Sequence, residues 1–419
     1  MSVFLKATSW HSRSPKSILI GAAIVGVSAL VLSGCSTPVK PVETSAPRAP
    51  LTLKIGAILP QSGTLASFGP PEEAGVALAV SDVNDADLGI KIDVQYRDSG
   101  DTTTDTATAS ATDLLSKGVS AIIGASSSGV SKTIIDQITK AGVIEFSPAS
   151  TSVDFTNYAD DGLFWRTAPS DVLQGAALGN LIASDGVQNL GIIALNDPYG
   201  TGLSKTLTET FESAGGKVVA SPLFNTGDTV FTTQIAKVIA AKPDGIALVT
   251  AAEATTIVPA LQAAGYKGPL YFVDANLLNY SATFTAGALT GDKGTRPGVD
   301  VSKLADFTDQ LKKIDPTLTD FSYAPESYDA VVLLALAALA ANSTDGKKIA
   351  AKLRQVSGGS GKGKKATDFA SAAQIIRDGR VVDYDGYSGP IAFDKNGDPT
   401  EATIGVYQYQ ADNTYKRIK

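Results

Sequence analysis

The segment GASSSGVSKT, from Gly124 to Thr133, has the residue types and spacing of a loop that binds an anion. Gly124 and Gly129 have the separation of the two glycines in a phosphate-binding loop, but Val130 stands where that loop has its lysine. A serine-nucleophile elbow is also excluded, because the glycines flank three serines. What remains is a tight turn before a helix N-terminus, whose free N–H groups and hydroxyls can bind a carboxylate or can simply cap the helix.

Three other segments resemble ligand loops, and each lacks an essential residue. Residues 200–206, GTGLSKT, lack the second Gly-Lys pair of a phosphate loop. Residues 358–365, GGSGKGKK, end in lysine where magnesium needs a hydroxyl, and no buried strand precedes them. Residues 394–398, DKNGD, begin like a calcium loop, but Pro399 and Gly405 replace its glycine and its last glutamate, which predicts a hairpin turn.

The residues that most hydrolases and metalloenzymes need are nearly absent. The 419-residue chain has one histidine, His11, and one cysteine, Cys35. Cleavage before Cys35 would leave no imidazole base for a nucleophile and no ligands for an ordinary zinc site. We therefore expect no enzyme, no metal and no cofactor, with an acid–base pair such as Asp274 and Glu253 as the enzymatic alternative. The net charge of −7 argues against a nucleic-acid partner.

The N-terminus has the pattern of a bacterial lipoprotein signal peptide. Basic residues precede an apolar run at 18–32 that is short for a membrane span, and the sequence LSGC ends at Cys35. The pattern predicts a signal peptide at 1–34 and a lipid such as palmitate on Cys35, with an uncleaved anchor helix as the alternative. Residues 35–50 are rich in proline and are expected to form an extended tether. Either reading places the folded part on the outer face of the cytoplasmic membrane.

From residue 51, short apolar runs alternate with amphipathic segments, which predicts strands that alternate with helices. This order is typical of a parallel sheet covered by helices on both faces. The alternation starts again near residue 163, so we expect a second α/β lobe. Residues 328–341 are expected to form an apolar helix under a sheet, 358–368 a solvated loop, and the chain end two strands joined by a Gly-Asp-Pro turn.

Six segments, in the same order along the chain, resemble the branched-chain amino acid binding proteins of ABC importers. They are LKIGAILPQSGTLASFGPPEEAGVALAVSDVN, AIIGASSSGVSKTIID, GVIEFSPASTSVDFT, LFWRTAPSDVLQG, ALNDPYGTGL and SYDAVVLLALAAL. The similarity spans about Leu53 to Tyr409. It implies an α/β fold of two similar Rossmann-like lobes with parallel sheets, joined by a three-strand hinge, as in type I periplasmic binding proteins.

The resemblance also implies how the chain divides. Residues 51–165 and 300–350 are expected in the first lobe, and 166–299 and 385–419 in the second. The segment 357–384 has no role that the sequence assigns.

The resemblance implies three residues that bind the ligand head group from the first lobe. Ser128 matches a serine that binds the ligand carboxylate by its hydroxyl and its N–H. Thr151 matches a threonine at the same head group, and Ala149 matches a residue whose carbonyl accepts from the ligand ammonium.

Three further residues follow from the same resemblance. Tyr199 matches a tyrosine of the second lobe that closes over the ligand, and Phe68 replaces a tyrosine that forms a wall of the cleft. Asp274 falls where the family often has an acid paired with the ammonium. The family's disulfide near the serine loop is missing, and VTAAEATT lacks the aromatic residues of some relatives, so that Glu253 and its neighbours shape a different pocket.

Together these features predict an extracytoplasmic solute-binding lipoprotein that captures an amino-acid-like ligand between its lobes. The resemblance implies that it works as a monomer and delivers the ligand to an ABC permease, without catalysis. The alternative is a sensor of the same fold for an amide, a urea or an aromatic acid.

Overall fold

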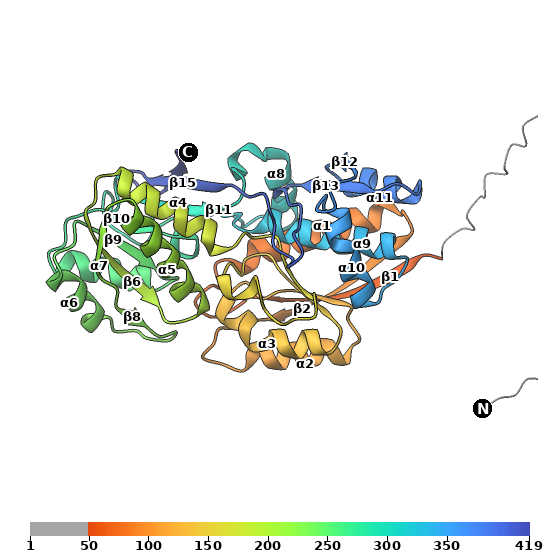
Figure 1. The fold of residues 1–419 in the computed structure, drawn as a ribbon, viewed down its shortest axis with the longest axis horizontal. Coiled ribbons are helices and arrows are strands. Elements are labelled where there is room, and N and C mark those ends of the chain that lie inside the picture. The colour runs from red at the N-terminus through yellow and green to blue at the C-terminus, as the bar shows by residue number, and fades with distance from the viewer. Residues whose placement is uncertain (1–48) are drawn as a thin grey trace, which may run out of the picture. The chain divides into compact units, whose positions relative to one another are not determined.

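Two mainly parallel sheets organise residues 49–419, which are the part of the chain that the computed structural model describes (Figure 1). The predicted signal peptide, Cys35 and nearly all of the tether lie outside these residues. The predicted α/β fold with two lobes is confirmed, since each sheet has helices on both of its faces.

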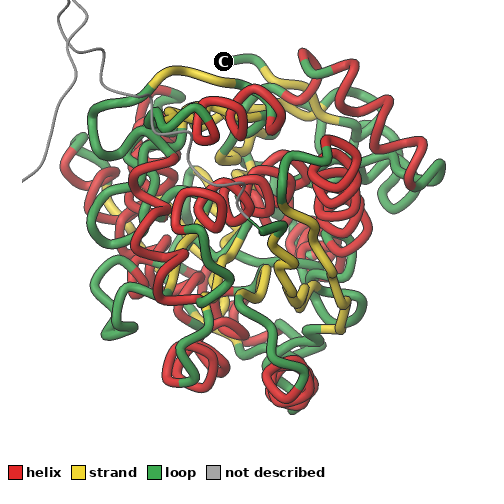
Figure 2. Tube along the Cα trace, turned by 90° about the vertical axis from the view of Figure 1, so that its right-hand side faces the viewer, coloured by secondary structure: helices red, strands yellow, loops and turns green. Residues whose placement is uncertain are grey.

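The first lobe is built on a five-stranded parallel sheet in the order β2-β1-β3-β4-β5. Its strands read as apolar runs because the sheet is buried on both faces. Helices α1, α9, α10 and α11 cover one face and helices α2 and α3 the other, around the strands seen in Figure 2. The bounds are β1 Leu51–Leu59, α1 Gly69–Ala86, β2 Ile90–Asp98, α2 Thr106–Ser116, β3 Ala121–Gly124, α3 Ser128–Lys140, β4 Ile144–Ser147, β5 Phe164–Arg166, α8 Ala305–Ile314, α9 Ala324–Ala341, α10 Gly346–Val356 and α11 Phe369–Arg377.

Helix α9 is apolar on all sides, and the structure explains why. Nearly all of its residues are buried, packed among α1, α10, α11 and the sheet. Within residues 49–419 it is the one helix whose length and composition would also suit a membrane span, but 89% of that stretch is buried in the protein. A helix that is hydrophobic all round is a core helix when protein surrounds it. The expectation of a helix under a sheet is therefore confirmed.

The second lobe is built on an eight-stranded sheet in the order β16-β15-β11-β10-β9-β6-β7, with β8 beside β6. Helices α4 and α5 cover one face, and α6 and α7 cover the other. Strands β15 and β16 run antiparallel and extend the edge beyond β11. The bounds are α4 Asp171–Ser184, β6 Asn189–Leu195, α5 Pro198–Ser213, β7 Lys217–Ala220, β8 Leu223–Phe224, α6 Thr232–Ala240, β9 Gly245–Val249, α7 Ala254–Ala263, β10 Leu270–Phe272, β11 Lys293–Pro297, β15 Ile404–Tyr409 and β16 Tyr415–Arg417.

The chain passes between the lobes after β5, after β11 and after the short strand β14 (Gly389–Pro390). Residues 167–170, 298–304 and 391–403 make these connections. They are mostly loops, with one short helical turn at Val301–Lys303, where the sequence suggested three strands.

Residues 357–399 pack on the first lobe, although the sequence grouped 385–399 with the second. Strands β12 (Lys364–Ala366), β13 (Val382–Gly386) and β14 form a small sheet there, so part of the expected solvated loop is a strand. Phe393 is fully buried in the core of the first lobe, with its ring 5.2 Å from that of Trp165. The 394–398 turn is present, but its flanks form an isolated bridge between Phe393 and Pro399 instead of two strands, and the C-terminal hairpin is formed by β15 and β16.

Candidate functional site

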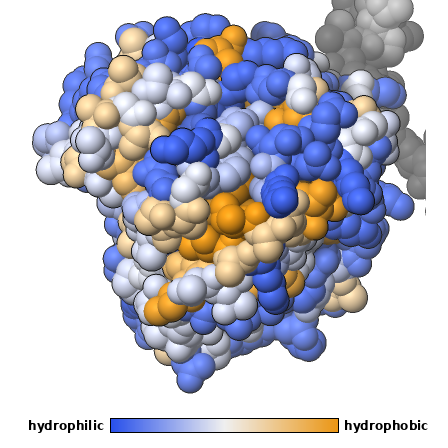
Figure 3. All heavy atoms as spheres, turned by 90° about the vertical axis from the view of Figure 1, so that its left-hand side faces the viewer, coloured by the Kyte–Doolittle hydropathy of each residue, from blue (hydrophilic) through white to orange (hydrophobic). Residues whose placement is uncertain are grey.

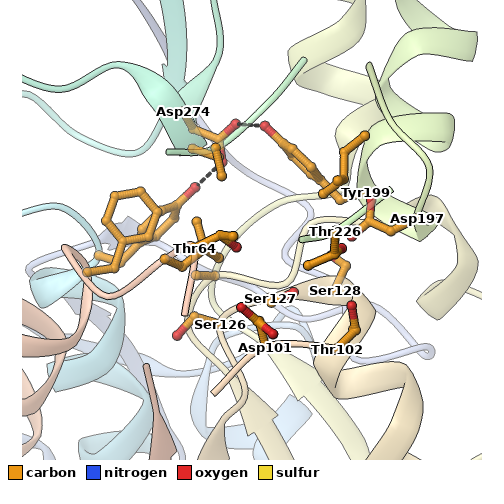
Figure 4. A pocket seen from close by; sticks show the side chains of 17 residues that line it. Thr64, Asp101, Thr102, Ser126, Ser127, Ser128, Asp197, Tyr199, Thr226 and Asp274 are labelled. Atoms are coloured by element: carbon orange, nitrogen blue, oxygen red, sulfur yellow. Dashed lines mark hydrogen bonds between the residues drawn. The ribbon is translucent and has the colours of Figure 1, made fainter. Parts of the chain in front are cut away.

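A cleft between the two lobes holds a cavity whose walls come from both (Figure 4). The space between the walls is about 510 Å³ when the part open to solvent is included. Most of the wall residues follow the carboxyl ends of parallel strands, where open α/β sheets bind ligands. They are Thr64, Leu65, Phe68, Asp101, Thr102, Ser126, Ser127, Ser128, Ala149, Leu195, Asp197, Tyr199, Thr226, Ala251, Asp274, Ala275 and Tyr323.

The segment between β3 and α3 gives this wall an anion-binding turn. Ser127 is the N-cap of α3, and its Oγ accepts from the N–H of Val130 at 3.4 Å. The N–H groups of Ser128 and Gly129 have no partner among the described residues, as expected for the first turn of a helix. Ser128 Oγ accepts from the N–H of Ser152 at 3.2 Å, so its own hydrogen can be donated into the cleft. The helix dipole and these donors favour a single negative group.

Ala149 lies on the wall, whereas Thr151 lies behind it. No described residue donates to the Ala149 carbonyl, so this acceptor is available to a ligand. Thr151 is buried, and its carbonyl accepts from the N–H of Asp171 at 2.8 Å. Burial, together with the charge of Asp274, raises the pKa of Asp171 well above its usual range. Of the six predicted site residues, Thr151 is the one that the structure does not bring to the cavity wall.

Asp274 opens a short helical turn after β10 and is the centre of the second-lobe wall. The Tyr199 and Tyr323 hydroxyls donate to its two oxygens, each at 2.6 Å, as the dashed lines in Figure 4 show. Gln174 Nε2 from α4 donates to Oδ1 at 3.0 Å. Burial, together with the Asp274 carboxylate, raises the pKa of both tyrosines, which keeps their hydroxyls protonated as donors. A carboxylate has about four acceptor positions, so one remains for a ligand.

An apolar section of the wall connects the polar ends. Phe68 packs edge-on against Tyr323, with ring centroids 5.4 Å apart. Phe68 and Tyr323 are both buried, and they close the cleft on the first-lobe side. Leu65, Leu195 and Ala251 add aliphatic surface. This section suits the carbon chain of a ligand, because apolar contact there removes hydrocarbon from water.

Two further carboxylates, Asp101 and Asp197, face the cleft from opposite lobes. Asp101 Oδ1 accepts from the N–H and the hydroxyl of Thr103, at 2.9 and 2.5 Å. Asp197 Oδ1 caps α5 by accepting from the N–H of Gly200 at 2.7 Å. Burial raises the pKa of Asp197 to about 6, so it is mostly ionised at neutral pH. A Cβ added at Gly129 would lie 3.0 Å from Asp197 Oδ2, a tight contact that would require the aspartate to shift slightly, so glycine favours the close approach of the two lobes here.

Arg166 holds the wall from behind. Its side chain is fully buried and binds Asp398 with two hydrogen bonds, Nε to Oδ1 at 2.6 Å and a terminal nitrogen to Oδ2 at 3.0 Å. The same guanidinium donates to the carbonyls of Ser150 and Ser152 at 3.1 and 2.8 Å. It thereby fixes the loop that carries Ala149 to the connection between β14 and β15. Gly397 makes this possible, because a Cβ there would lie 2.5 Å from the carbonyl of Phe164.

A second hollow lies between α6 and α7 on the outer face of the second lobe. Its walls are alanine, isoleucine, threonine, valine and phenylalanine side chains, and Val230 beside it is 73% exposed. Figure 3 shows that face, on which apolar side chains gather. No charged side chain lines this hollow, so it cannot pair the charged groups of an amino acid.

Within residues 49–419, no group of three or more histidine, cysteine, aspartate or glutamate residues is arranged to hold a metal ion.

Sequence reasoning missed several wall residues, and it had signals for some of them. Asp101 and Asp197 each follow a strand that the sequence predicted, and the carboxyl-end rule for parallel strands would have singled them out. Tyr323 had no such signal, because it precedes α9 and reaches Asp274 from 49 residues away. Arg166 and Asp398 are 232 residues apart in the chain and share no local pattern.

The lobes, the cleft and the three connections are those of a type I periplasmic binding protein. The family model described as periplasmic binding protein matches residues 52–412, and the chain belongs to this family. It is therefore a solute-binding protein of the extracytoplasmic kind.

Individual relatives agree with this placement. The chain is 27% identical over 380 residues to Leu/Ile/Val-binding protein homolog 1 of Brucella suis, covering 87% of this chain and 93% of that one. It is 24% identical over 349 residues to the chemotactic signal transduction system substrate-binding protein BasB of Halobacterium salinarum, covering 80% and 82%. The crystal structure of the leucine-binding protein LivK of Thermotoga maritima has the same fold, with a TM-score of 0.71, 22% identity and coverage of 88% and 98%.

Proposed function

We propose that the cleft captures an α-amino acid and that the chain delivers it to an ABC importer. The observation that supports this most directly is the separation of two kinds of polar group in one cavity. Unpartnered donors at Ser128 lie on the first lobe, and the acceptor Asp274 lies on the second. A zwitterion satisfies both and bridges the lobes, whereas burying either of its charges without a partner would cost several kcal/mol.

In this arrangement the ligand carboxylate lies at the first turn of α3, where Ser128 donates from its N–H and hydroxyl. The ammonium lies between the Ala149 carbonyl and Asp274. Tyr199 closes over the ligand from the second lobe, and Phe68 forms the facing wall. Thr151 contributes from behind the wall, by holding α4 through its contact with the N–H of Asp171. The ligand leaves the site unchanged, because no step in this arrangement forms or breaks a bond.

Delivery to a permease follows from closure of the lobes. A ligand that contacts both lobes stabilises the closed form, which a permease can distinguish from the empty one. The name of the Brucella suis relative supports amino-acid capture, whereas that of BasB supports a sensor of the same fold. Loss of amino-acid uptake on deletion of the gene would favour transport, and loss of a tactic response with uptake intact would favour sensing. We propose that the chain acts as a monomer in either case.

Replacing Ser128 by alanine should weaken amino-acid binding by about 1–3 kcal/mol, because one donor to the buried carboxylate is lost. A thermal-shift screen of the purified chain identifies the amino acid, since a ligand at 100 times its dissociation constant adds about 2.7 kcal/mol of stability. Titration calorimetry then measures the loss.

Ser213→Ala is the control for this variant, because Ser213 is exposed at the end of α5 and its hydroxyl contacts only the Glu209 carbonyl. Equal affinity for Ser128→Ala and the parent chain would contradict the carboxylate site. Mass spectrometry of the recovered ligand checks that it is unchanged, and any turnover product would contradict a purely binding role.

We further propose that a lipid on Cys35 tethers the protein to the outer face of the membrane. Replacing Cys35 by serine should move the protein from the membrane fraction to the soluble fraction, because a serine hydroxyl cannot form the thioether. Cell fractionation, with labelled palmitate as a second readout, measures this. Labelled, membrane-bound Cys35→Ser protein would contradict the proposal.

A further inference from the structure

The cleft contains more negative charge than a neutral amino acid can balance. Asp274, Asp101 and Asp197 all line it, and none of them forms an ion pair with any lysine or arginine in the described part of the chain. No lysine, arginine or histidine lines the cavity. A zwitterion adds one charge of each sign and leaves the total unchanged. Its carboxylate, held at Ser128, would also lie on the same wall as Asp101 and Ser127 (Figure 4).

A fourth carboxylate lies beside this wall and has an oxygen without a partner. Glu253 follows β9 and is 92% buried, with 8% of its surface exposed. Its Oε2 accepts from the N–H of Ala251 at 2.8 Å, whereas its buried Oε1 has no partner among residues 49–419. Burial raises the pKa of Glu253, and the charge of Asp101 raises it further; the charge of Glu253 in turn adds to the raised pKa of Asp197. A buried acceptor of this kind normally has a donor.

We propose that the physiological ligand carries a second cationic group and is a dibasic amino acid, whose side-chain cation is paired with Asp101 and Asp197. This inference rests on the proposed amino-acid function of the same cleft. Asp274 takes the α-ammonium, and the side-chain cation lies between the two lobes, where the Oδ2 atoms of Asp101 and Asp197 accept no hydrogen bond from a residue within 49–419. The hydroxyls of Thr102, Ser127 and Thr226 line the same part of the wall.

The wall chemistry favours an organic cation over a metal ion. The carboxylates are not arranged as a metal-binding group, as noted above. Leu65, Leu195 and Ala251 also line the cavity, and these side chains contact hydrocarbon well and bind no ion. An aliphatic chain that ends in an ammonium or a guanidinium fits both features, since its methylenes can lie on apolar surface while its charged head is paired.

Two pairs of ligands, tested on the unaltered protein, isolate the effect of the ligand's second charge on affinity. Lysine and norleucine have side chains of similar length and differ in the terminal ammonium, and arginine and citrulline differ in the charge of the terminal group. Calorimetry on the purified chain should give at least tenfold tighter binding for the cationic member of one pair. Equal or tighter binding of norleucine and citrulline would overturn the inference and leave the amino-acid function standing. Binding of no amino acid at all would overturn both.

Asparagine variants locate the charge within the cleft. Asp101→Asn and Asp197→Asn keep the oxygen that accepts from Thr103 and from Gly200, so both turns can form. Each should lower the ratio of lysine to norleucine affinity, or of arginine to citrulline affinity, by about tenfold, as loss of one charge-assisted hydrogen bond does.

Asp412→Asn is the matched control. Asp412 accepts from the N–H and the hydroxyl of Thr414 at 3.0 and 2.6 Å, as Asp101 does from Thr103, but it lies in the β15–β16 hairpin outside the cleft. The Asp412→Asn variant should keep the parent chain's ratio of lysine to norleucine affinity, or of arginine to citrulline affinity. Ratios that are the same in all three variants would overturn the inference, and the wild-type ligand pairs keep the test valid if a variant does not fold.

Discussion

Replacing Arg166 by methionine should lower the free energy of unfolding by about 3–5 kcal/mol, which is the usual effect of removing one partner from a buried ion pair. The guanidinium is fully buried, and the Asp398 side chain is only 12% exposed. Without Arg166, the carboxylate of Asp398 would have to stay charged without a cation or take up a proton. The carbonyls of Ser150 and Ser152 would each lose a charged donor as well. Denaturant unfolding followed by circular dichroism measures the change.

Arg97→Met is the control for this measurement. Arg97 also pairs with an aspartate at 2.6 Å, but both side chains are partly exposed, at 30% and 42%. Exposed pairs contribute about 0–1 kcal/mol, so this variant should unfold close to the parent chain. Similar losses for Arg166→Met and Arg97→Met would show that the buried pair does not fix the loop of Ala149 to the segment between β14 and β15 as described.

The contrast between these two arginines shows what local sequence patterns can predict. The strands and helices followed from runs of apolar residues, because burial on both faces of a parallel sheet requires such runs. The turn at 394–398 was also predicted, from its glycine and aspartates. The ion pair that this turn makes was not predicted, because Arg166, the partner of Asp398, lies 232 residues away and only the folded chain brings the two together.

Some residues of the candidate site were likewise predictable from the sequence, and others were not. Ser128 and Ala149 lie in segments whose resemblance to a known family extends over neighbouring residues, and the structure places both on the cavity wall. Thr151 lies in one of these segments too, but it is buried and does not line the cavity, and its carbonyl accepts from the N–H of Asp171 at the start of α4. Asp101 and Glu253 are ordinary in sequence. Asp101 matters because it lines a cavity without a lysine or arginine on its wall, and Glu253 because its buried Oε1 has no partner among residues 49–419. Both features arise only when the chain is folded.

Replacing Asp274 by asparagine should weaken binding of the amino acid by at least about 30-fold, or roughly 2–5 kcal/mol, because the ammonium loses its charged partner in a buried site. The amide also reverses part of the hydrogen bonding. Asp274 accepts from both tyrosine hydroxyls, and an asparagine NH2 in place of one oxygen would point a donor at a donor. Calorimetry with the amino acid found by the thermal-shift screen measures the loss.

Two companion variants separate the charge from the hydrogen bonds around it. Tyr323→Phe removes one donor and keeps the carboxylate, so it should cost far less than Asp274→Asn, about 0.5–1.5 kcal/mol for one hydrogen bond. Asp412→Asn removes a carboxylate from the second lobe outside the cleft and should leave affinity unchanged. An Asp274→Asn protein that folds, as judged by its unfolding transition, and binds as tightly as the parent would contradict the ammonium site. A loss in Tyr323→Phe as large as in Asp274→Asn would instead assign the effect to the orientation of the carboxylate, because both variants would then disturb binding through the same hydrogen bond.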